Sequence, residues 1–304
     1  MTHTIAVVGA GLSVLADSLQ TLLIARFIAG AGMASVVPAV IAWVGEVLPP
    51  DQRVAGATDM NSAYATGAAA GVLGAGLLAD ARGWAWGFGA SGLLGGLALL
   101  ATLRLFSPPP PATPGSLRVA LGVPAVRWLA GIALVEGATL FGLFAFLAPT
   151  LLATGASASL AGVLIAAYGL SVVLWSRVAR AATPRVPVLR LMAFGGAMLT
   201  LGWSAVAWSP GAGGVLSASV MMGSTIIFFH SQLQVWATQA APQARGPGIA
   251  MFSGCLFVGA SLGTALGRPL FAAGQVQLLF AVGALTAPEF GLNIWLSARW
   301  WARW

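Results

Sequence analysis

The chain has 304 residues, of which 59% are hydrophobic and only 7% are charged. A soluble domain carries about 25% charged residues, so this composition excludes a soluble globular domain and indicates an integral membrane protein. All 14 basic residues are arginine. Because a P-loop nucleotide site requires a lysine, a pump driven by its own P-loop ATPase is also excluded.

The net charge of +7 does not indicate a nucleic-acid partner, because the arginines lie between apolar spans and form no cluster with exposed aromatic residues. Cys255 is the single cysteine, so neither an internal disulfide framework nor a cysteine-based metal site is expected. His3 and His230 are the two histidines. We therefore expect no metal and no cofactor.

The chain divides into apolar segments that approach the roughly 20 residues needed to cross a bilayer as a helix. Ten such segments can be delimited: Thr4 to Leu19, Thr21 to Val47, Ala57 to Ala79, Trp84 to Phe106, Trp128 to Leu152, Leu160 to Val178, Val188 to Trp208, Gly213 to Ala237, Gly248 to Leu266 and Val276 to Leu296. The predicted fold is an all-α integral membrane bundle of about ten transmembrane helices. The first segment is short and begins almost at Met1, so it looks cut.

The arginines predict the orientation of these helices, because cytoplasmic loops are enriched in basic residues. With the N-terminus inside, the arginines on the cytoplasmic side are Arg53, Arg104, Arg118, Arg127, Arg177, Arg180, Arg185, Arg190, Arg245, Arg299 and Arg303. Only Arg82 and Arg268 fall outside, and Arg26 lies within a span. The absence of lysine with abundant alanine and glycine is typical of GC-rich bacteria. We expect a multi-pass protein of the inner (plasma) membrane with both termini in the cytoplasm.

The longest polar interruption is Ser107 to Val126, whose run of prolines favours an extended, semi-rigid spacer. It predicts three parts: a four-span bundle in residues 1–106, a cytoplasmic linker in residues 107–126 and a six-span bundle in residues 127–304. A carrier of two equal halves would be divided evenly. The inequality therefore predicts that two helices are absent at the front.

Four motifs follow one another along the chain. They are LLIARFIAGAG at Leu22 to Gly32, GEVLPPDQR at Gly45 to Arg53, GAAAGVLGAGLLADARGWAWGF at Gly67 to Phe88, and HSQLQVWATQAAPQARGPGIAMF at His230 to Phe252. In these segments the chain resembles the major facilitator superfamily, and within it the bacterial drug and arabinose efflux members. The resemblance begins at the family's third transmembrane helix and implies a major-facilitator-type bundle.

A stripe of small residues runs along the third segment at helical spacings of four, three and four, ending at Leu78. In a bilayer, such residues let a neighbouring helix approach closely. The stripe resembles the antiporter motif of the family's fifth helix, although Val72 and Ala75 depart from the family pattern. The resemblance implies packing against the other half of the carrier by Gly67, Gly71, Gly74 and Gly76.

Charged side chains inside a bilayer are functional candidates, because each costs at least about 2.5 to 3.5 kcal/mol there. Glu136 lies about 12 Å along a helix from Trp128, well inside the hydrocarbon, where its carboxyl group could carry a proton. A structural hydrogen bond to a neighbouring helix is an equal alternative. The resemblance assigns Arg26 to proton coupling, and the alternative is that Arg26 only snorkels toward the outer interface.

Polar residues of two other spans are candidates for lining the substrate cavity. His230 and Gln234 share one helix face at four-residue spacing, although hydrogen bonds between helices would explain them equally well. Tyr64 and Asn61 lie near the inner end of their span and are further cavity candidates.

Two pairs of charges near the ends of the spans are interpreted as gating pairs that favour one conformation of the carrier. They are Asp80 with Arg82 and Glu46 with Arg53. An exposed pair contributes only about 0 to 1 kcal/mol, so only a bias between conformations is expected.

These observations predict a secondary active transporter and not an enzyme, because no grouping of His, Asp and Ser or Cys could form a triad. Many aromatic and few charged residues favour a small, largely apolar substrate, exported in exchange for protons by alternating access. Sugar efflux stays open through the arabinose-efflux resemblance. A truncated or wrongly started, transport-inactive remnant is another alternative, motivated by the four-plus-six division. The expected partners are the lipid bilayer, the small-molecule substrate and protons, without nucleic acid, and the chain is expected to be a monomer.

Overall fold

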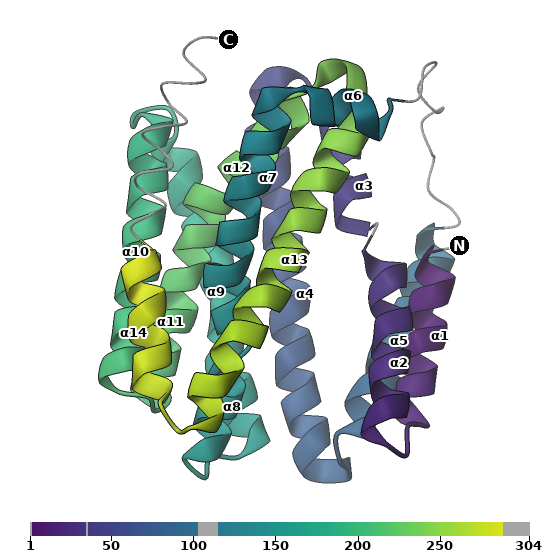
Figure 1. Cartoon of the computed structure of the whole chain (residues 1–304), viewed down its shortest axis with the longest axis vertical. Helices are drawn as coiled ribbons and strands as arrows, with labels where there is room; N and C mark the ends of the chain where they lie inside the picture. The colour runs from purple at the N-terminus through teal and green to yellow at the C-terminus, as the bar shows by residue number, and fades with distance from the viewer. Residues whose placement is uncertain (1, 35, 103–114, 288–304) are drawn as a thin grey trace.

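The structure is a computed structural model that describes residues 2–34, 36–102 and 115–287, and this part contains helices but no strand (Figure 1). The helices before the linker are α1 (Thr2–Val14), α2 (Leu19–Met33), α3 (Val36–Val47), the 3-10 turn η1 (Pro50–Gln52), α4 (Arg53–Arg82) and α5 (Ala85–Thr102). We call α1 to α5 the first half.

The helices after the linker, α7 to α14, form what we call the second half. They are α7 (Pro124–Glu136), α8 (Leu147–Ala153), α9 (Ala158–Ala182), α10 (Val188–Trp208), α11 (Ala212–Thr225), α12 (Ser231–Gln239), α13 (Arg245–Ala272) and α14 (Val276–Thr286). Three short elements join or interrupt them: the π-helices η2 (Gly137–Gly142) and η3 (Ile226–His230) and the 3-10 turn η4 (Pro242–Ala244).

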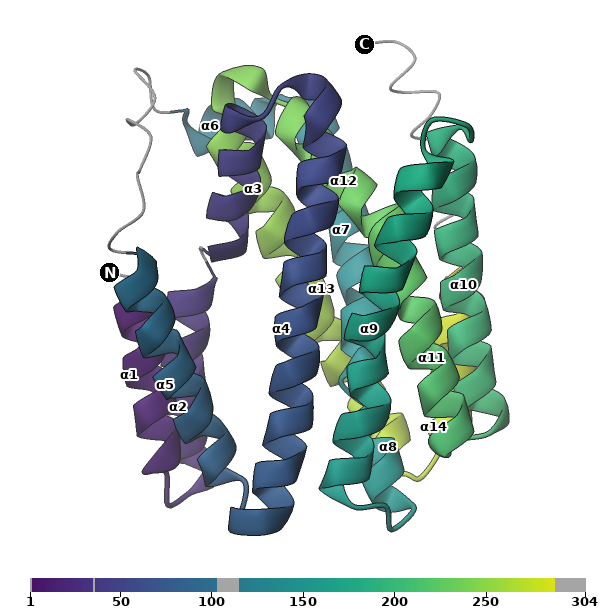
Figure 2. The same cartoon turned by 180° about the vertical axis from the view of Figure 1, so that it is seen from behind.

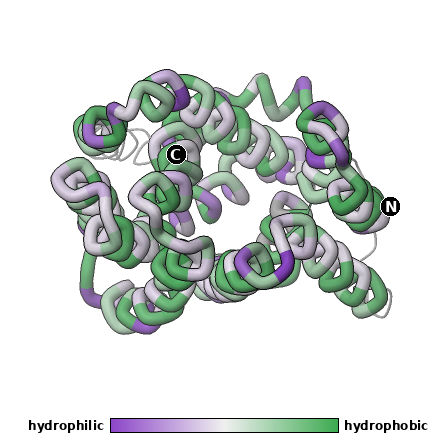
Figure 3. Tube along the Cα trace, turned by 90° about the horizontal axis from the view of Figure 1, so that it is seen from below, coloured by the Kyte–Doolittle hydropathy of each residue, from purple (hydrophilic) through white to green (hydrophobic). Residues whose placement is uncertain are grey.

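The described helices confirm the predicted class of an all-α membrane bundle. Eight of them, some joined end to end, are long and apolar enough to cross a bilayer, and two shorter apolar helices lie at His3–Val14 and Val276–Thr286. Hydrophobic residues occur on helices all around the bundle when it is seen along its long axis (Figure 3). In α5, for example, no residue is buried, as expected for a helix that faces lipid.

The predicted linker is partly helical, which corrects the expectation of an extended spacer over residues 107–126. Residues 103–114 lie outside the described part, but Leu117–Gly122 form the short helix α6. The Ser116 side chain caps this helix by accepting a hydrogen bond from the Val119 amide at 3.2 Å. The sequence after Pro114 contains no proline until Pro124, so the backbone amides needed for a helical turn are available.

The two halves meet along α4 and α9, which run side by side through the length of the bundle (Figures 1 and 2). A second contact joins α3 to α12 and α13. We name the two ends of the bundle the α6 end and the α8 end, after the short helices that lie there (Figure 1). The main buried cluster belongs largely to the second half; from the described first half, Ile41 and Ala65 are buried in it and Met60 and Val72 pack against it.

Candidate functional site

A buried acid and a buried histidine meet between α7 and η3. Nδ1 of His230 lies 3.0 Å from Oε1 of Glu136, and the two side chains are 6% and 0% exposed. At this distance the two atoms share a proton: either the ring donates to the carboxylate or the acid donates to the ring nitrogen. Gaining one proton changes the net charge of the pair from −1 to 0.

Both residues lie where the α-helical pattern is interrupted. Glu136 is the last residue of α7, directly before η2, and His230 is the last residue of η3. π-Helical turns inside longer helices are frequent at functional sites. The other carboxyl oxygen of Glu136, Oε2, is buried and has no hydrogen-bond partner in the described part of the chain. The carboxyl group can therefore hold a proton at a position that the protein leaves free.

Glycines hold the Glu136 region tightly against α13. A Cβ atom at Gly137 would lie 2.0 Å from the Leu256 carbonyl oxygen, and one at Gly259 would lie 2.0 Å from the Leu134 carbonyl oxygen. Only glycine permits backbones to pack this closely. The backbone next to Glu136 is therefore packed directly against α13.

A second polar group, which we call the amide cluster, joins the two halves. It consists of Asn61 on α4 and Ser231 and Gln234 on α12, all buried. Nδ2 of Asn61 donates to Oε1 of Gln234 at 2.7 Å and to Oγ of Ser231 at 2.9 Å. Gln234 lies one helical turn beyond His230, so the amide cluster and the Glu136–His230 pair are consecutive polar layers.

A cavity of about 610 Å³, the central cavity, lies between the halves beside these two layers. Its volume is in the range of small-molecule sites, and most of its lining is apolar, as is common for such sites. It is lined by Val36, Val40, Trp43, Val44, Leu48, Gly56, Asp59, Met60, Asn61, Ala63, Tyr64, Phe141, Tyr168, Ile226, His230, Gln234, Leu256 and Phe257. His230 also packs edge-to-face on Phe141, with ring centroids 5.8 Å apart.

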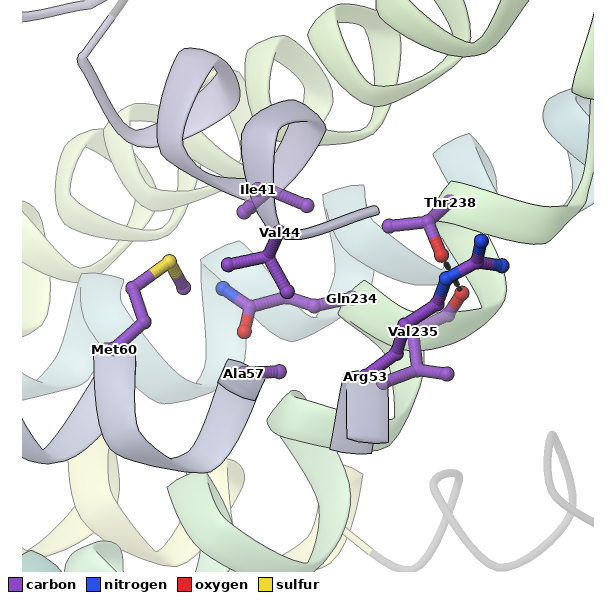
Figure 4. A pocket seen from close by; sticks show the side chains of 8 residues that line it. All are labelled: Ile41, Val44, Arg53, Ala57, Met60, Gln234, Val235 and Thr238. Atoms are coloured by element: carbon purple, nitrogen blue, oxygen red, sulfur yellow. Dashed lines mark hydrogen bonds between the residues drawn. The ribbon is translucent and has the colours of Figure 1, made fainter. Parts of the chain in front are cut away.

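A much smaller space of about 10 Å³ adjoins the central cavity and shares Val44, Met60 and Gln234 with it. Figure 4 shows Gln234 extending between Val44 and Ala57 toward Met60, with Arg53 and Thr238 on the other side. A space of this size holds about one water molecule. Side chains from both halves therefore pack closely here and leave room for about one water molecule.

The four predicted cavity residues Asn61, Tyr64, His230 and Gln234 all line the central cavity. The structure thus brings Glu136, His230, Asn61 and Gln234 into adjoining layers. Arg26 lies elsewhere: it is exposed on α2, and its guanidinium carbon lies 4.9 Å from the ring centre of Phe88. Arg26 forms no ion pair within the described residues.

Among the described residues, no ion pair joins Asp80 to Arg82, the predicted gating pair. Instead, Asp80 accepts hydrogen bonds from the backbone amides of Ser159 and Ala158, at 2.8 and 3.3 Å, and thereby caps the N-terminus of α9. The first N–H groups of a helix have no partner within the helix, and they bind a carboxylate favourably. Arg82 lies over the ring of Trp86.

For the other predicted pair, Arg53 donates from Nε to the Leu48 carbonyl oxygen at 3.1 Å, and the side chain of Glu46 lies outside the described part. The charge pair that does join the halves is Arg180 of α9 with Asp59 of α4. Sequence reasoning missed it because the two residues are 121 positions apart. It also missed Ser231, Phe141 and Tyr168, whose residue types give no distinguishing signal within an apolar span.

The close contact between α4 and α9 uses a different face of α4 from the predicted glycine stripe. A Cβ atom at Gly76 would lie 2.5 Å from the Ala158 carbonyl oxygen, whereas one at Gly67, Gly71 or Gly74 would meet no atom within 4 Å. The other close approach comes from α9, where a Cβ atom at Gly169 would lie 2.4 Å from the Ala65 carbonyl oxygen. The close approach of the two helices thus depends largely on small residues of α9.

Comparison with known proteins gives one family and one fold. The family model described as Major Facilitator Superfamily matches residues 2–297. The crystal structure of a variant of the E. coli fucose:proton symporter FucP is similar with 13% identity and a TM-score of 0.72, over 97% of this chain and 82% of that chain. A structure of FucP in the outward conformation is similar with 14% identity and a TM-score of 0.71, over 97% of this chain and 81% of that chain. The curated proteins give no significant match.

Proposed function

The chain belongs to the major facilitator superfamily, a family of membrane transporters, and from this premise we propose that it exports small, largely apolar molecules in exchange for protons. The observation that carries the proposal is the buried Glu136–His230 pair beside the central cavity. A proton-coupled carrier needs a group that binds and releases a proton at the depth of the substrate site.

The charge of the pair supplies a physical link between the proton and the conformation of the carrier. When the pair carries −1, burial is costly, and conformations that bring water to it are favoured. When the pair has gained a proton and is neutral, the closed, dry arrangement is favoured. Alternating access then follows if the halves move about the α4–α9 contact while the packed residues near Gln234 separate.

The lining of the central cavity supports an apolar cargo. Trp43, Phe141 and Phe257 provide aromatic surface, and Asp59, the charged residue among the lining residues, is already paired with Arg180. A strongly charged or many-hydroxylated substrate would find few partners there. The resemblance to efflux members supports the export direction and the exchange with protons, and the arginine pattern supports a cytoplasmic position for the α6 end.

The test is transport into proteoliposomes with an imposed pH gradient, with the uncharged fluorescent probe N-phenyl-1-naphthylamine as cargo. We expect Glu136→Gln to abolish accumulation driven by the gradient while probe exchange without a gradient continues, because the cavity is intact but the proton site is lost. The matched control is Asp51→Asn, an exposed acid in η1. Gradient-driven accumulation by Glu136→Gln at the wild-type rate would refute the assignment.

Arg26 keeps the coupling role that the resemblance implies as a separate hypothesis. Arg26 is not among the residues that line the central cavity, so this role would act without contact between Arg26 and the cargo. In the same assay, Arg26→Ala is expected to reduce gradient-driven accumulation and to leave exchange unchanged. An Arg26→Ala variant with wild-type accumulation would assign coupling to the Glu136–His230 pair alone.

A further inference from the structure

The amide cluster uses only part of its hydrogen-bonding capacity. Asn61 has two N–H groups on Nδ2, and both are used, one on Gln234 Oε1 and one on Ser231 Oγ. The Ser231 hydroxyl in turn donates to the Ile226 carbonyl oxygen at 3.0 Å. The cluster is therefore held in one arrangement from both sides.

Two polar atoms of the amide cluster remain free. Within the described chain, the hydrogen bonds of the cluster use Nδ2 of Asn61 and Oε1 of Gln234 and leave Oδ1 of Asn61 and Nε2 of Gln234 without a protein partner. Both residues are nearly fully buried, at 4% and 2% exposure, and both line the central cavity. The cavity wall thus presents one acceptor and one donor from two neighbouring amide groups.

A molecule that fills the central cavity covers these two atoms, and binding is opposed if it leaves them without a hydrogen-bond partner. A carboxylate offers no donor for Asn61, and an ammonium group offers no acceptor for Gln234. A carboxamide or lactam offers an N–H beside a C=O and is uncharged. The aromatic and aliphatic lining around the cluster fits an apolar remainder.

We infer that the amide cluster recognises cargo that carries a carboxamide- or lactam-type group on an apolar body. The cargo N–H donates to Oδ1 of Asn61, and Nε2 of Gln234 donates to the cargo carbonyl oxygen. Because Asn61 belongs to the first half and Gln234 to the second, the cargo bridges the two halves. This inference rests on the proposed transport function, since it names the chemistry of the transported molecule.

The test compares binding of three probes to the purified full chain in detergent by equilibrium dialysis. 2-Naphthamide carries the N–H and the C=O, N,N-dimethyl-2-naphthamide carries only the C=O, and 2-ethylnaphthalene carries neither. Gln234→Met and Asn61→Leu remove the donor and the acceptor. Gln232→Met is the matched control, because Gln232 lies on the same helix but does not line the central cavity.

We expect the wild-type chain and Gln232→Met to bind 2-naphthamide at least about tenfold more tightly than the other two probes. In Gln234→Met and Asn61→Leu this preference should disappear while 2-ethylnaphthalene binding persists, which shows that the cavity is still formed. Equal affinities in the wild-type chain, or a preference that survives both substitutions, would overturn the inference.

Failure of this inference is distinguishable from failure of the proposed function. If N-phenyl-1-naphthylamine is exported at the expense of a proton gradient but the amide preference is missing, only the recognition of amides is wrong. If the preference is present but no probe moves against a gradient, amide recognition stands and the coupling to protons is wrong.

Discussion

The carboxyl group of Glu136 has His230 as its single hydrogen-bond partner in the described chain. Breaking such a pair by removing one member leaves an uncompensated buried group and typically costs about 3 to 5 kcal/mol, whereas replacing both members by apolar residues is often neutral. We therefore expect this pair to be costly to break by a single substitution and to be replaceable by two apolar residues.

We accordingly predict that His230→Phe lowers the thermal stability of the chain and that Glu136→Leu combined with His230→Phe restores it. The single substitution leaves Glu136 buried without a partner, and the double substitution removes the buried polar group altogether. The measurement is the thermal unfolding midpoint in detergent. A double variant that is less stable than His230→Phe alone would contradict this explanation.

The sequence indicates that Glu136 and His230 are functional candidates, but it does not indicate that they form a pair. Glu136 stands out as an acid deep in an apolar span, and His230 as a histidine on a span with polar neighbours. The two are 94 residues apart, and neither helical periodicity nor composition says which faces of two distant helices meet. The same holds for Asn61 and Gln234.

Among the helices, α4 and α9 form the most extensive contact between the halves. The sequence identifies the small-residue character of α4 correctly but not the face that is used. A helix with glycine and alanine on several sides permits close approach in several directions, so the partner decides which one is taken. On α9, Gly162 and Gly169 provide the complementary surface.

Substitutions on the two faces should therefore differ in stability. Gly169→Ala places a Cβ atom 2.4 Å from the Ala65 carbonyl oxygen and is expected to cost about 1 to 3 kcal/mol through overpacking. Gly71→Ala meets no atom within 4 Å and should be neutral or stabilising by up to about 1 kcal/mol through its helix propensity. Thermal unfolding of both variants in detergent is the measurement. Equal destabilisation by the two would mean that the Gly71 face is also packed.

Asp80 holds the two halves together at the α8 end by binding the first amides of α9. Asp80→Ala should therefore widen the distance between spin labels on Ala81 and Thr154, which are both exposed, in a Cys255→Ala background. Arg82→Gln is the control and should leave this distance unchanged. Electron–electron double resonance measures the distance between the two labels. If Arg82→Gln widened this distance and Asp80→Ala did not, the explanation would be contradicted.

For the whole molecule, the class of fold follows from composition and span length, because a chain in lipid must satisfy its backbone groups within helices. The positions at which the helices depart from regular α-helix do not follow from composition and span length. The π-helical turns η2 and η3 lie inside apolar runs that a hydropathy count records as uninterrupted spans. The short helix α6 likewise can be predicted only if Ser116 is recognised as its N-terminal cap.

The arginine asymmetry predicts an orientation in the membrane, and this prediction is testable with single cysteines in a Cys255→Ala background. Ser116→Cys at the α6 end is predicted to react with an impermeant maleimide only from the cytoplasmic side, and Thr154→Cys at the α8 end only from outside. Labelling of both from the same side would contradict the topology.

The central claim is that a proton on the Glu136–His230 pair is exchanged for cargo, and the most direct test is substrate-driven proton movement. Proteoliposomes that contain an internal pH dye receive a cargo gradient without an imposed pH gradient. The account predicts that protons move opposite to the cargo in the wild-type chain and Asp51→Asn, and that Glu136→Gln moves cargo without protons. Proton movement in the same direction as the cargo, or undiminished proton movement in Glu136→Gln, would contradict it.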